Sequence, residues 1–356
     1  MRELNIGGLL VPVPVVQGGM GVGISMSRLA SAVANEGGVG VISSAGLGLV
    51  HKNRSLGFIE ANSEGLRKEI RSAREKSDGV LGVNIMVAMS NFAELVKTAM
   101  AEKIDVIFSG AGLPFDLPRF LTDNSDTKLV PIVSSGRAAR LICMKWEKAY
   151  GYLPDAIVVE GPKAGGHLGF KASDIERGEN TLEQLIEDVV KEVSQYGRES
   201  GKIIPVIAAG GIYTGRDIKR IIERGASGVQ MGTRFVTTEE CDASERFKQT
   251  YLEASESDIR IIQSPVGMPG RAIFNAFLEK VKEGLKRPVK CPFKCIRTCD
   301  VQSSPYCIIT ALYNAYRGRM KNGYAFAGSN AFLADRITTV REVFSDLLKE
   351  FNTGPE

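Results

Sequence analysis

The feature that most constrains the fold is an eightfold alternation of short apolar segments with longer amphipathic ones. Each apolar segment is rich in β-branched residues and precedes a stretch with helical spacing of apolar residues. The eight predicted strands cover residues 13–17, 39–45, 82–86, 105–110, 129–135, 155–161, 204–211 and 228–235. Eight such units in about 255 residues predict an α/β fold of the (β/α)8 barrel type.

The alternative fold is an open, doubly wound sheet, which also has parallel strands that are apolar on both faces. It is disfavoured because no GxGxxG motif opens the chain with an acidic residue about 20 positions later. The alternation stops near residue 256, so we divide the chain into a barrel domain, residues 1–255, and a C-terminal appendage or lid, residues 256–356. Residues 255–273 resemble a loop, and the rest of the appendage is expected to be mostly helical and to contain cysteines.

Charge and hydropathy exclude several kinds of partner. The net charge of +4 is small for 356 residues, which gives no indication of nucleic-acid binding. No apolar run reaches the length of a membrane helix, and the first residues lack a signal-peptide core. We therefore expect a cytoplasmic protein that acts on a small molecule, with no membrane partner and with a homodimer left open.

Glycines concentrate where the predicted strands end. The carboxyl ends of barrel strands form the working face of such folds, and glycine lets a backbone approach a ligand closely. The segments concerned are QGGMG (17–21), SGAG (109–112), GPKAGGHLG (161–169), AAGGI (208–212) and QMGTRF (230–235). A ligand pocket is expected at this end of the barrel.

The last two of these motifs predict a phosphate site. Barrels of this kind bind phosphate in the loops after strands seven and eight, through free amide groups and a helix dipole. Gly-Gly in AAGGI and Gly232 in QMGTRF offer such amides, and the Thr233 hydroxyl adds a donor. One Gly-Gly pair alone would indicate only a tight turn, but two motifs at adjacent strands favour an anion site.

His167, one of two histidines in the chain, lies in the glycine-rich segment GPKAGGHLGF. The unperturbed pKa of histidine lies nearest neutral pH, so this ring is suited to moving a proton on a bound ligand. The alternative is a histidine that only caps the loop. His51 follows the second predicted strand without a motif and is interpreted as structural or as a pocket-wall residue.

Six motifs resemble those of FMN-dependent barrel enzymes: VVQGGMG, GVNIM, SGAG, AGGHLG, PVIAAGGI and QMGTRF. They span residues 10 to about 275, and they resemble the nitronate monooxygenases (2-nitropropane dioxygenases) and the flavin-type enoyl-acyl-carrier-protein reductases. The resemblance implies that His167 is catalytic. It also implies the cofactor contacts. The residues that would contact the flavin ring or line the pocket beside it are Gly19, Met20, Asn84, Gly161 and Gly166. The residues that would hold the phosphate and the ribityl chain are Gly210, Gly211, Gln230, Met231, Gly232 and Thr233.

Three functions remain open at this point. The first is nitronate monooxygenase, in which FMN takes electrons from a nitronate and passes them to oxygen, with His167 as base for neutral substrate. The second is an NAD(P)H-dependent enoyl-ACP or enoyl-CoA reductase, in which His167 assists protonation. The third is a flavin-binding protein without turnover.

Lys163 departs from the motif of these families, which commonly have an acidic residue there. A cation at this point favours an anionic substrate or a reduced, anionic flavin. The alternative is a side chain that points to solvent and has no role in the site. Glu160, at the end of the sixth predicted strand, is a candidate ionic partner for Lys163.

Four of the six cysteines lie within 17 residues: Cys291, Cys295, Cys299 and Cys307. Structural zinc sites favour two separated C-x2–4-C pairs, whereas this closer spacing is nearer to that of iron–sulfur sites. We predict one metal centre here, iron–sulfur ahead of zinc. An iron–sulfur cluster near FMN would relay electrons and favour the reductase. The alternative is four reduced thiols, some of them buried as small apolar groups.

Overall fold

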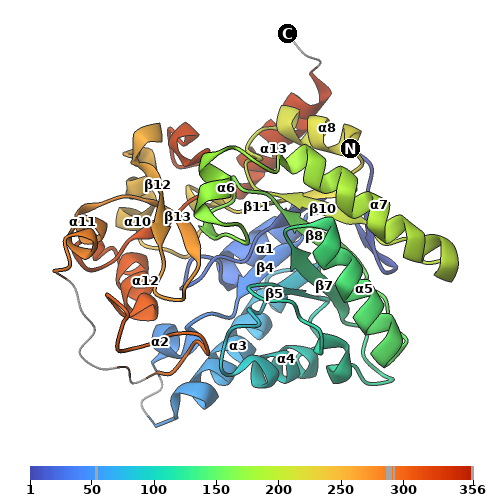
Figure 1. Ribbon diagram of the computed structural model, residues 1–356, viewed down its shortest axis with the longest axis horizontal. Helices are drawn as coiled ribbons and strands as arrows, with labels where there is room; N and C mark the ends of the chain where they lie inside the picture. The colour runs from blue at the N-terminus through green and yellow to red at the C-terminus, as the bar shows by residue number, and fades with distance from the viewer. Residues whose placement is uncertain (53–54, 286–290, 292, 354–356) are drawn as a thin grey trace.

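The computed structural model describes residues 1–52, 55–285, 291 and 293–353 (Figure 1). Eight parallel strands form one sheet in the order β3-β11-β10-β8-β7-β6-β5-β4. A parallel bridge between Val16 and Val39 joins the first of these strands to the last, so the sheet closes. The prediction of a (β/α)8 barrel is confirmed. The strands are β3 (Val15–Gln17), β4 (Gly40–Ser43), β5 (Leu81–Asn84), β6 (Val106–Ser109), β7 (Lys128–Val133), β8 (Ile157–Glu160), β10 (Val206–Ala209) and β11 (Gly228–Met231).

Apolar side chains lie on both faces of the barrel strands. Val16, Phe108 and Ile207 belong to a buried cluster of residues from alternate strand positions, which fills the interior. The hairpin β1 (Leu4–Ile6) and β2 (Leu9–Val11) packs onto this cluster. Neighbouring positions such as Val15 and Ile42 pack outward against the helices. Burial of each such side chain stabilises the fold by about 1.5–3 kcal/mol.

Helices surround the barrel, and several begin at a residue whose side chain caps them. Thr181 and Thr214 each form a capping box, and Ser135 accepts a hydrogen bond from the Ala138 amide. The helices along the barrel are α1 (Ser27–Asn35), α2 (Leu47–His51), α3 (Phe58–Arg74), α4 (Phe92–Ala101), α5 (Gly136–Tyr150), α6 (Ala172–Glu176), α7 (Leu182–Ser200), α8 (Gly215–Glu223), α9 (Thr233–Val236) and α10 (Glu245–Leu252). The weakly helical fourth unit contains only the 3-10 turn η1 (Leu117–Phe120).

The last helix, α13 (Val340–Asn352), packs against α8 and α1. Its Glu350 accepts a hydrogen bond from the Gly215 amide at 2.6 Å, and Arg341 pairs with Glu36 of the turn after α1. Gly215 permits this approach, because a Cβ there would lie 2.1 Å from the Leu347 carbonyl oxygen. The end of the chain therefore contributes to the helical layer. The domain boundary at residue 255 stays a prediction.

The expected loop at 255–273 is wrong, since this segment forms an antiparallel hairpin. Strand β12 (Ile259–Gln263) pairs with β13 (Pro269–Ile273), with Gln263 opposite Pro269. Strand β13 also pairs with β14 (Ala325–Phe326) and with β9 (Gly166–His167). The prolines and glycines of SPVGMPG obscured two short strands whose partners lie far along the chain.

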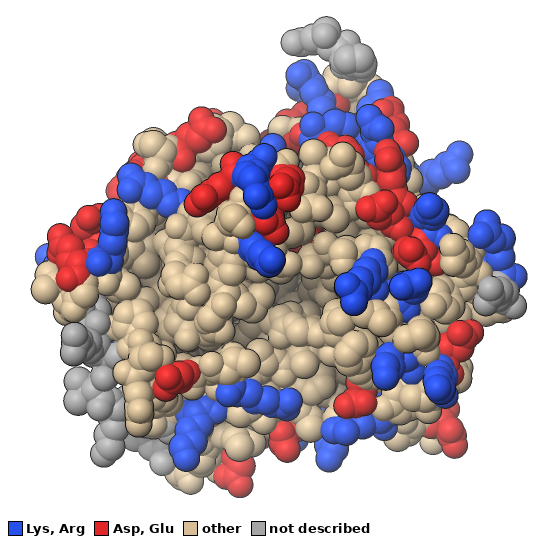
Figure 2. Space-filling model, viewed as in Figure 1, with Lys and Arg blue, Asp and Glu red and all other residues tan. Residues whose placement is uncertain are grey.

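Helices α11 (Ala276–Lys282) and α12 (Ile308–Tyr316) follow the hairpin, as the apolar periodicity predicted. Short 3-10 turns occupy η2 (Glu256–Asp258), η3 (Met320–Asn322) and η4 (Ala331–Leu333). In Figure 1, α11 and α12 lie with α10, β12 and β13 on one side of the barrel. Figure 2 shows that the middle of the same view is mostly uncharged, with most Lys, Arg, Asp and Glu side chains toward its edge. Among the described residues, no helix is long and apolar enough to cross a membrane.

Candidate functional site

A cavity of about 300 Å³ lies at the carboxyl ends of the barrel strands. This volume is at the lower end of the range for small-molecule sites. Its walls include the ends of all eight barrel strands, together with Tyr324 and residues 326–330. The structure brings together at this cavity every residue predicted to contact the cofactor, except Gly161, and also His167. The roles of these residues remain predictions.

Glycines from different strands allow the predicted site residues to pack closely. A Cβ on Gly19 would lie 2.3 Å from the Asn84 Cβ, and one on Gly232 would lie 3.3 Å from the Met20 sulfur. A Cβ on Gly18 would lie 3.3 Å from Gln230. Side chains at these glycines would displace their neighbours at the cavity wall, so the spacing of the loops depends on their absence.

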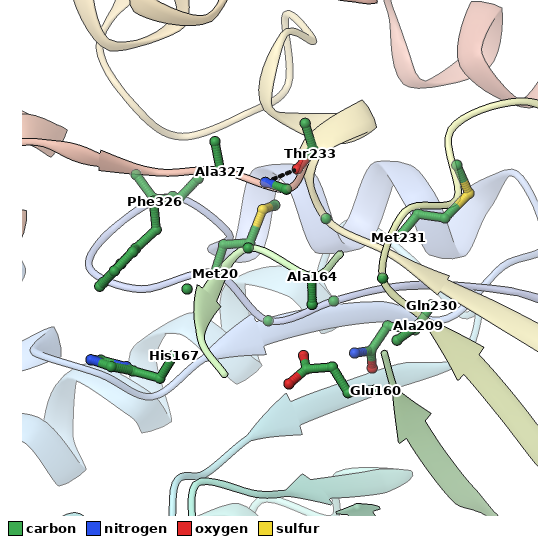
Figure 3. A pocket seen from close by; sticks show the side chains of 18 of the residues that line it. Met20, Glu160, Ala164, His167, Ala209, Gln230, Met231, Thr233, Phe326 and Ala327 are labelled. Carbon is green, nitrogen blue, oxygen red and sulfur yellow. Dashed lines mark hydrogen bonds between the residues drawn. The ribbon is translucent and has the colours of Figure 1, made fainter. Parts of the chain in front are cut away.

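The phosphate motifs form a backbone cradle at the ends of β10 and β11, which we define as Gly210, Gly211, Gly232 and Thr233. Gly210 and Gly211 have φ values of +98° and +80°, a conformation that favours glycine. The Thr233 hydroxyl accepts a hydrogen bond from the Gly328 amide at 2.9 Å (Figure 3). The cradle offers backbone amides and a hydroxyl to an anionic ligand.

Gly161 lies behind the cradle. Its amide donates to the Ala209 carbonyl at 2.8 Å. Its carbonyl oxygen would lie 2.9 Å from a Cβ on Gly210. Gly161, which was predicted to line the pocket beside the flavin ring, is not among the residues that line the cavity. Its observed hydrogen bonds are to Ala209 at the end of β10 and to Ala164.

His167 lies on the two-residue strand β9, directly opposite Gly270 of β13. Its Nε2 is 2.7 Å from the Ser264 hydroxyl oxygen, and its ring meets the ring of Phe326 edge-on with centroids 5.0 Å apart. Figure 3 shows the two rings on the same side of the cavity. Burial lowers the pKa of His167 to about 4, so the imidazole is neutral near pH 7 and can accept a proton.

Arg271 of β13 holds the loop that carries His167. This buried guanidinium donates from Nη1 to the carbonyl oxygens of Pro162 and Ala164, at 2.5 and 2.7 Å. Burial lowers the pKa of Arg271 from its ordinary value. Sequence reasoning missed this residue, and its signal was a charged residue inside the otherwise apolar or small segment PGRAI.

Glu160, at the end of β8, points into the cavity beside Gln230 (Figure 3). Burial raises the pKa of its carboxyl group to about 7. The expected ion pair with Lys163 is absent from the described part of the chain, although both residues line the cavity.

The other residues that sequence reasoning missed come from the C-terminal segment. Tyr324 and Phe326 add aromatic surface near His167, and Leu312 of α12 adds an aliphatic side chain. Asn330 donates from Nδ2 to the Gly211 carbonyl at 3.0 Å, which backs the cradle. The segment AFAGSN contains a Gly-Ser pair, a signal of a loop but not of its place beside the cavity.

His51 does not line the cavity. Its Nε2 is 2.7 Å from a carboxylate oxygen of Glu69 on α3, in keeping with its structural interpretation.

The four clustered cysteines do not form a metal site in the part of the chain that the structure describes. No three His, Cys, Asp or Glu side chains among those residues are grouped so as to hold a metal ion. Cys295 is buried and shares an apolar cluster with Val22 and Ile309, and Cys307 packs at its edge. Burial, together with the nearby thiols, raises the pKa of Cys295 to about 12. These contacts match the alternative of reduced thiols packed as small apolar groups.

A model of the nitronate monooxygenase family matches residues 2–103 and 88–350, which is most of the chain. A curated relative in Staphylococcus aureus strain Newman, "Probable nitronate monooxygenase", is 27% identical over 315 residues, with 77% of this chain and 79% of the relative covered.

A second relative carries a different name. The Mycobacterium tuberculosis H37Rv protein "(3aS,4S,5R,7aS)-5-hydroxy-7a-methyl-1-oxo-octahydro-1H-indene-4-carboxyl-CoA dehydrogenase" is 30% identical over 271 residues. The match covers 76% of this chain and 66% of that relative, so the chain spans just under two thirds of its length.

Among solved structures, FabK from Thermotoga maritima is similar with 32% sequence identity and a TM-score of 0.74. The superposition covers 96% of this chain and 93% of FabK, so the likeness includes the C-terminal segment.

Proposed function

Because the chain belongs to the nitronate monooxygenase family, we propose that it is an FMN-dependent oxidoreductase that oxidises alkyl nitronates. The observation that carries this proposal is that His167 and the backbone cradle line the same cavity, with the imidazole held by Ser264. A neutral imidazole suits the acceptance of a proton from a carbon acid.

The residues present fit FMN. Side chains at Gly210 and Gly211 would meet the loop that follows β8, so their absence leaves amides free beside the cavity. The cradle would hold the phosphate, whereas Met20 and Asn84 would lie along the ring. Tyr213 is buried at the cavity wall, and the Arg234 guanidinium lies against its ring. FMN, when bound, supplies the electron acceptor.

The chain's own residues would handle the proton and the surroundings. His167 takes the proton from the carbon next to the nitro group of a neutral nitroalkane, and Ser264 restrains the imidazole. Phe326 and Tyr324 exclude water from the apolar end, which keeps the imidazole neutral before reaction. A preformed nitronate needs no such deprotonation.

Oxygen uptake tests this function. The purified yellow protein should consume oxygen with a preformed alkyl nitronate and should release FMN rather than FAD on heating. A protein that binds no FMN, or one that binds FMN but oxidises no nitronate of any chain length, contradicts the proposal.

An enoyl-thioester reductase is the second candidate, favoured by the 32% identity with FabK, an enoyl-ACP reductase, over nearly the whole chain. NAD(P)H would be the electron donor of such a reductase. A metal centre on Cys291, Cys295, Cys299 and Cys307 would serve this second function as an electron relay. NAD(P)H consumption under nitrogen, with and without an enoyl-CoA, separates the two functions. Iron and acid-labile sulfide in anaerobically purified protein would support the relay, and four freely titrating thiols without metal would contradict it.

A further inference from the structure

Lys163 lies beside Gly211 of the cradle. An added Cβ on Gly211 would lie 2.8 Å from the Cβ of Lys163 and 3.0 Å from its Cδ. The aliphatic part of the lysine therefore runs across Gly211, in the space that a side chain there would fill. Lys163 also lines the cavity to which the cradle belongs.

The backbone of Lys163 is held by hydrogen bonds, whereas its ammonium has no ionic partner among the described residues. Its carbonyl oxygen accepts a hydrogen bond from the Ser329 amide at 3.1 Å, and Arg271 holds the carbonyl groups on either side. Lys163 is exposed, and Glu160, the carboxylate that shares the cavity lining with it, does not pair with its ammonium in the described residues. A fixed attachment point with an uncompensated charge suits a ligand-binding group.

The charges of the residues that line the cavity also favour an anion-binding role for Lys163. Among the lining residues that the structure describes, Lys163 is the only lysine or arginine and Glu160 the only carboxylate. A phosphate monoester carries close to two negative charges near pH 7. Amides and one hydroxyl supply only partial charges, so a full positive charge at the rim would stabilise the bound anion substantially.

We propose that the ammonium of Lys163 binds the phosphate monoester held by the cradle. The inference rests on the proposed function, in which that monoester belongs to FMN. The same cation could meet two other phosphate sources, the phosphates of a nicotinamide dinucleotide or of a CoA thioester, and the experiment below distinguishes these from FMN.

The test compares FMN with riboflavin, which has the same ring and ribityl chain but no phosphate. Both affinities are measured by fluorescence titration of flavin-depleted protein, for wild type, Lys163→Met, Lys163→Glu and Lys163→Arg. Lys163→Met should weaken FMN binding on the order of 10- to 100-fold, as expected for a charge-assisted hydrogen bond. The affinity of Lys163→Met for riboflavin should stay within about twofold of that of wild type. Lys163→Glu should lose more FMN affinity than Lys163→Met, and Lys163→Arg should retain most of the wild-type FMN affinity.

Lys97, an exposed lysine on α4 away from the cavity, provides matched controls as Lys97→Met and Lys97→Glu. If the depleted protein does not reload, the rate of FMN release from purified holoprotein replaces the titration, and release from Lys163→Met should be faster by the same factor. Equal losses of FMN and riboflavin affinity would overturn the inference, because they indicate a structural effect. Unchanged FMN affinity would also overturn it, and a raised KM for NADPH or enoyl-CoA would then assign the cation to substrate. A wild type that binds neither flavin contradicts the proposed function itself.

Discussion

The two ends of the cavity are built in different ways. The cradle consists of residues that follow neighbouring strands β10 and β11, and it offers amides and a hydroxyl. The end with His167 is apolar, and it exists because β9 pairs with β13, which in turn pairs with β14, about a hundred or more residues further along the chain. Anion binding at the cradle would therefore depend mainly on backbone conformation at the ends of two neighbouring strands, with support from Gly328 and Asn330. The protonation state of His167 depends on long-range packing throughout.

This difference predicts separable defects: damage at the cradle should remove the flavin, and damage at the histidine end should remove turnover.

The largest expected effect is that of Gly211→Asp. The carboxylate would repel the phosphate, its side chain would collide with Lys163, and the φ of +80° disfavours any non-glycine residue. We expect loss of FMN retention, measured as the flavin-to-protein ratio after gel filtration. Gly201→Asp is the matched control, because Gly201 has a similar φ of +72° but no atom near an added Cβ. Retention of stoichiometric FMN by the Gly211→Asp protein would contradict the proposal that the cradle binds the phosphate.

His167→Ala should keep FMN and lose turnover. Removal of a general base typically costs about 10²–10⁴-fold in rate. We expect this loss in kcat/KM with a neutral nitroalkane, and much less with its preformed nitronate. Activity within about twofold of wild type on the neutral substrate would return His167 to a structural role.

The pH profile should report the buried imidazole. His167 accepts a proton only when neutral, so its contribution is complete above its pKa of about 4 and declines as the pH falls through that value. We expect kcat/KM for a neutral nitroalkane to fall about tenfold per pH unit below that point, in protein that recovers full activity on return to pH 7. A decline in kcat/KM that begins near pH 6.5 instead would mean that the apolar end does not shield the imidazole from water.

Ser264→Ala should have the smallest effect. It removes a hydrogen bond worth about 1 kcal/mol, so a loss of about fivefold in kcat/KM is expected, with the FMN content unchanged. Ser173→Ala, at an exposed position on α6, is the control. A loss as large as that of His167→Ala would show that Ser264 itself takes part in proton transfer.

Local signals in the sequence were sufficient for the barrel and for much of its rim. Runs such as VIAA and GVQM are apolar and lie at regular intervals, and parallel pairing brings all their carboxyl ends to one face. Glycines at those ends, such as Gly19 and Gly232, could therefore be assigned to a common cavity before any contact between them was known.

Tertiary structure alone decided the rest. Arg271, Ser264 and Phe326 reach the glycine loop through strand pairing between segments far apart in the chain, and no local period encodes such a partner. Helix α13 reaches α8 because Gly215 leaves room for it. The pKa of His167 follows from the same packing: the sequence determines that an imidazole is present, and burial by the C-terminal segment determines that it is neutral.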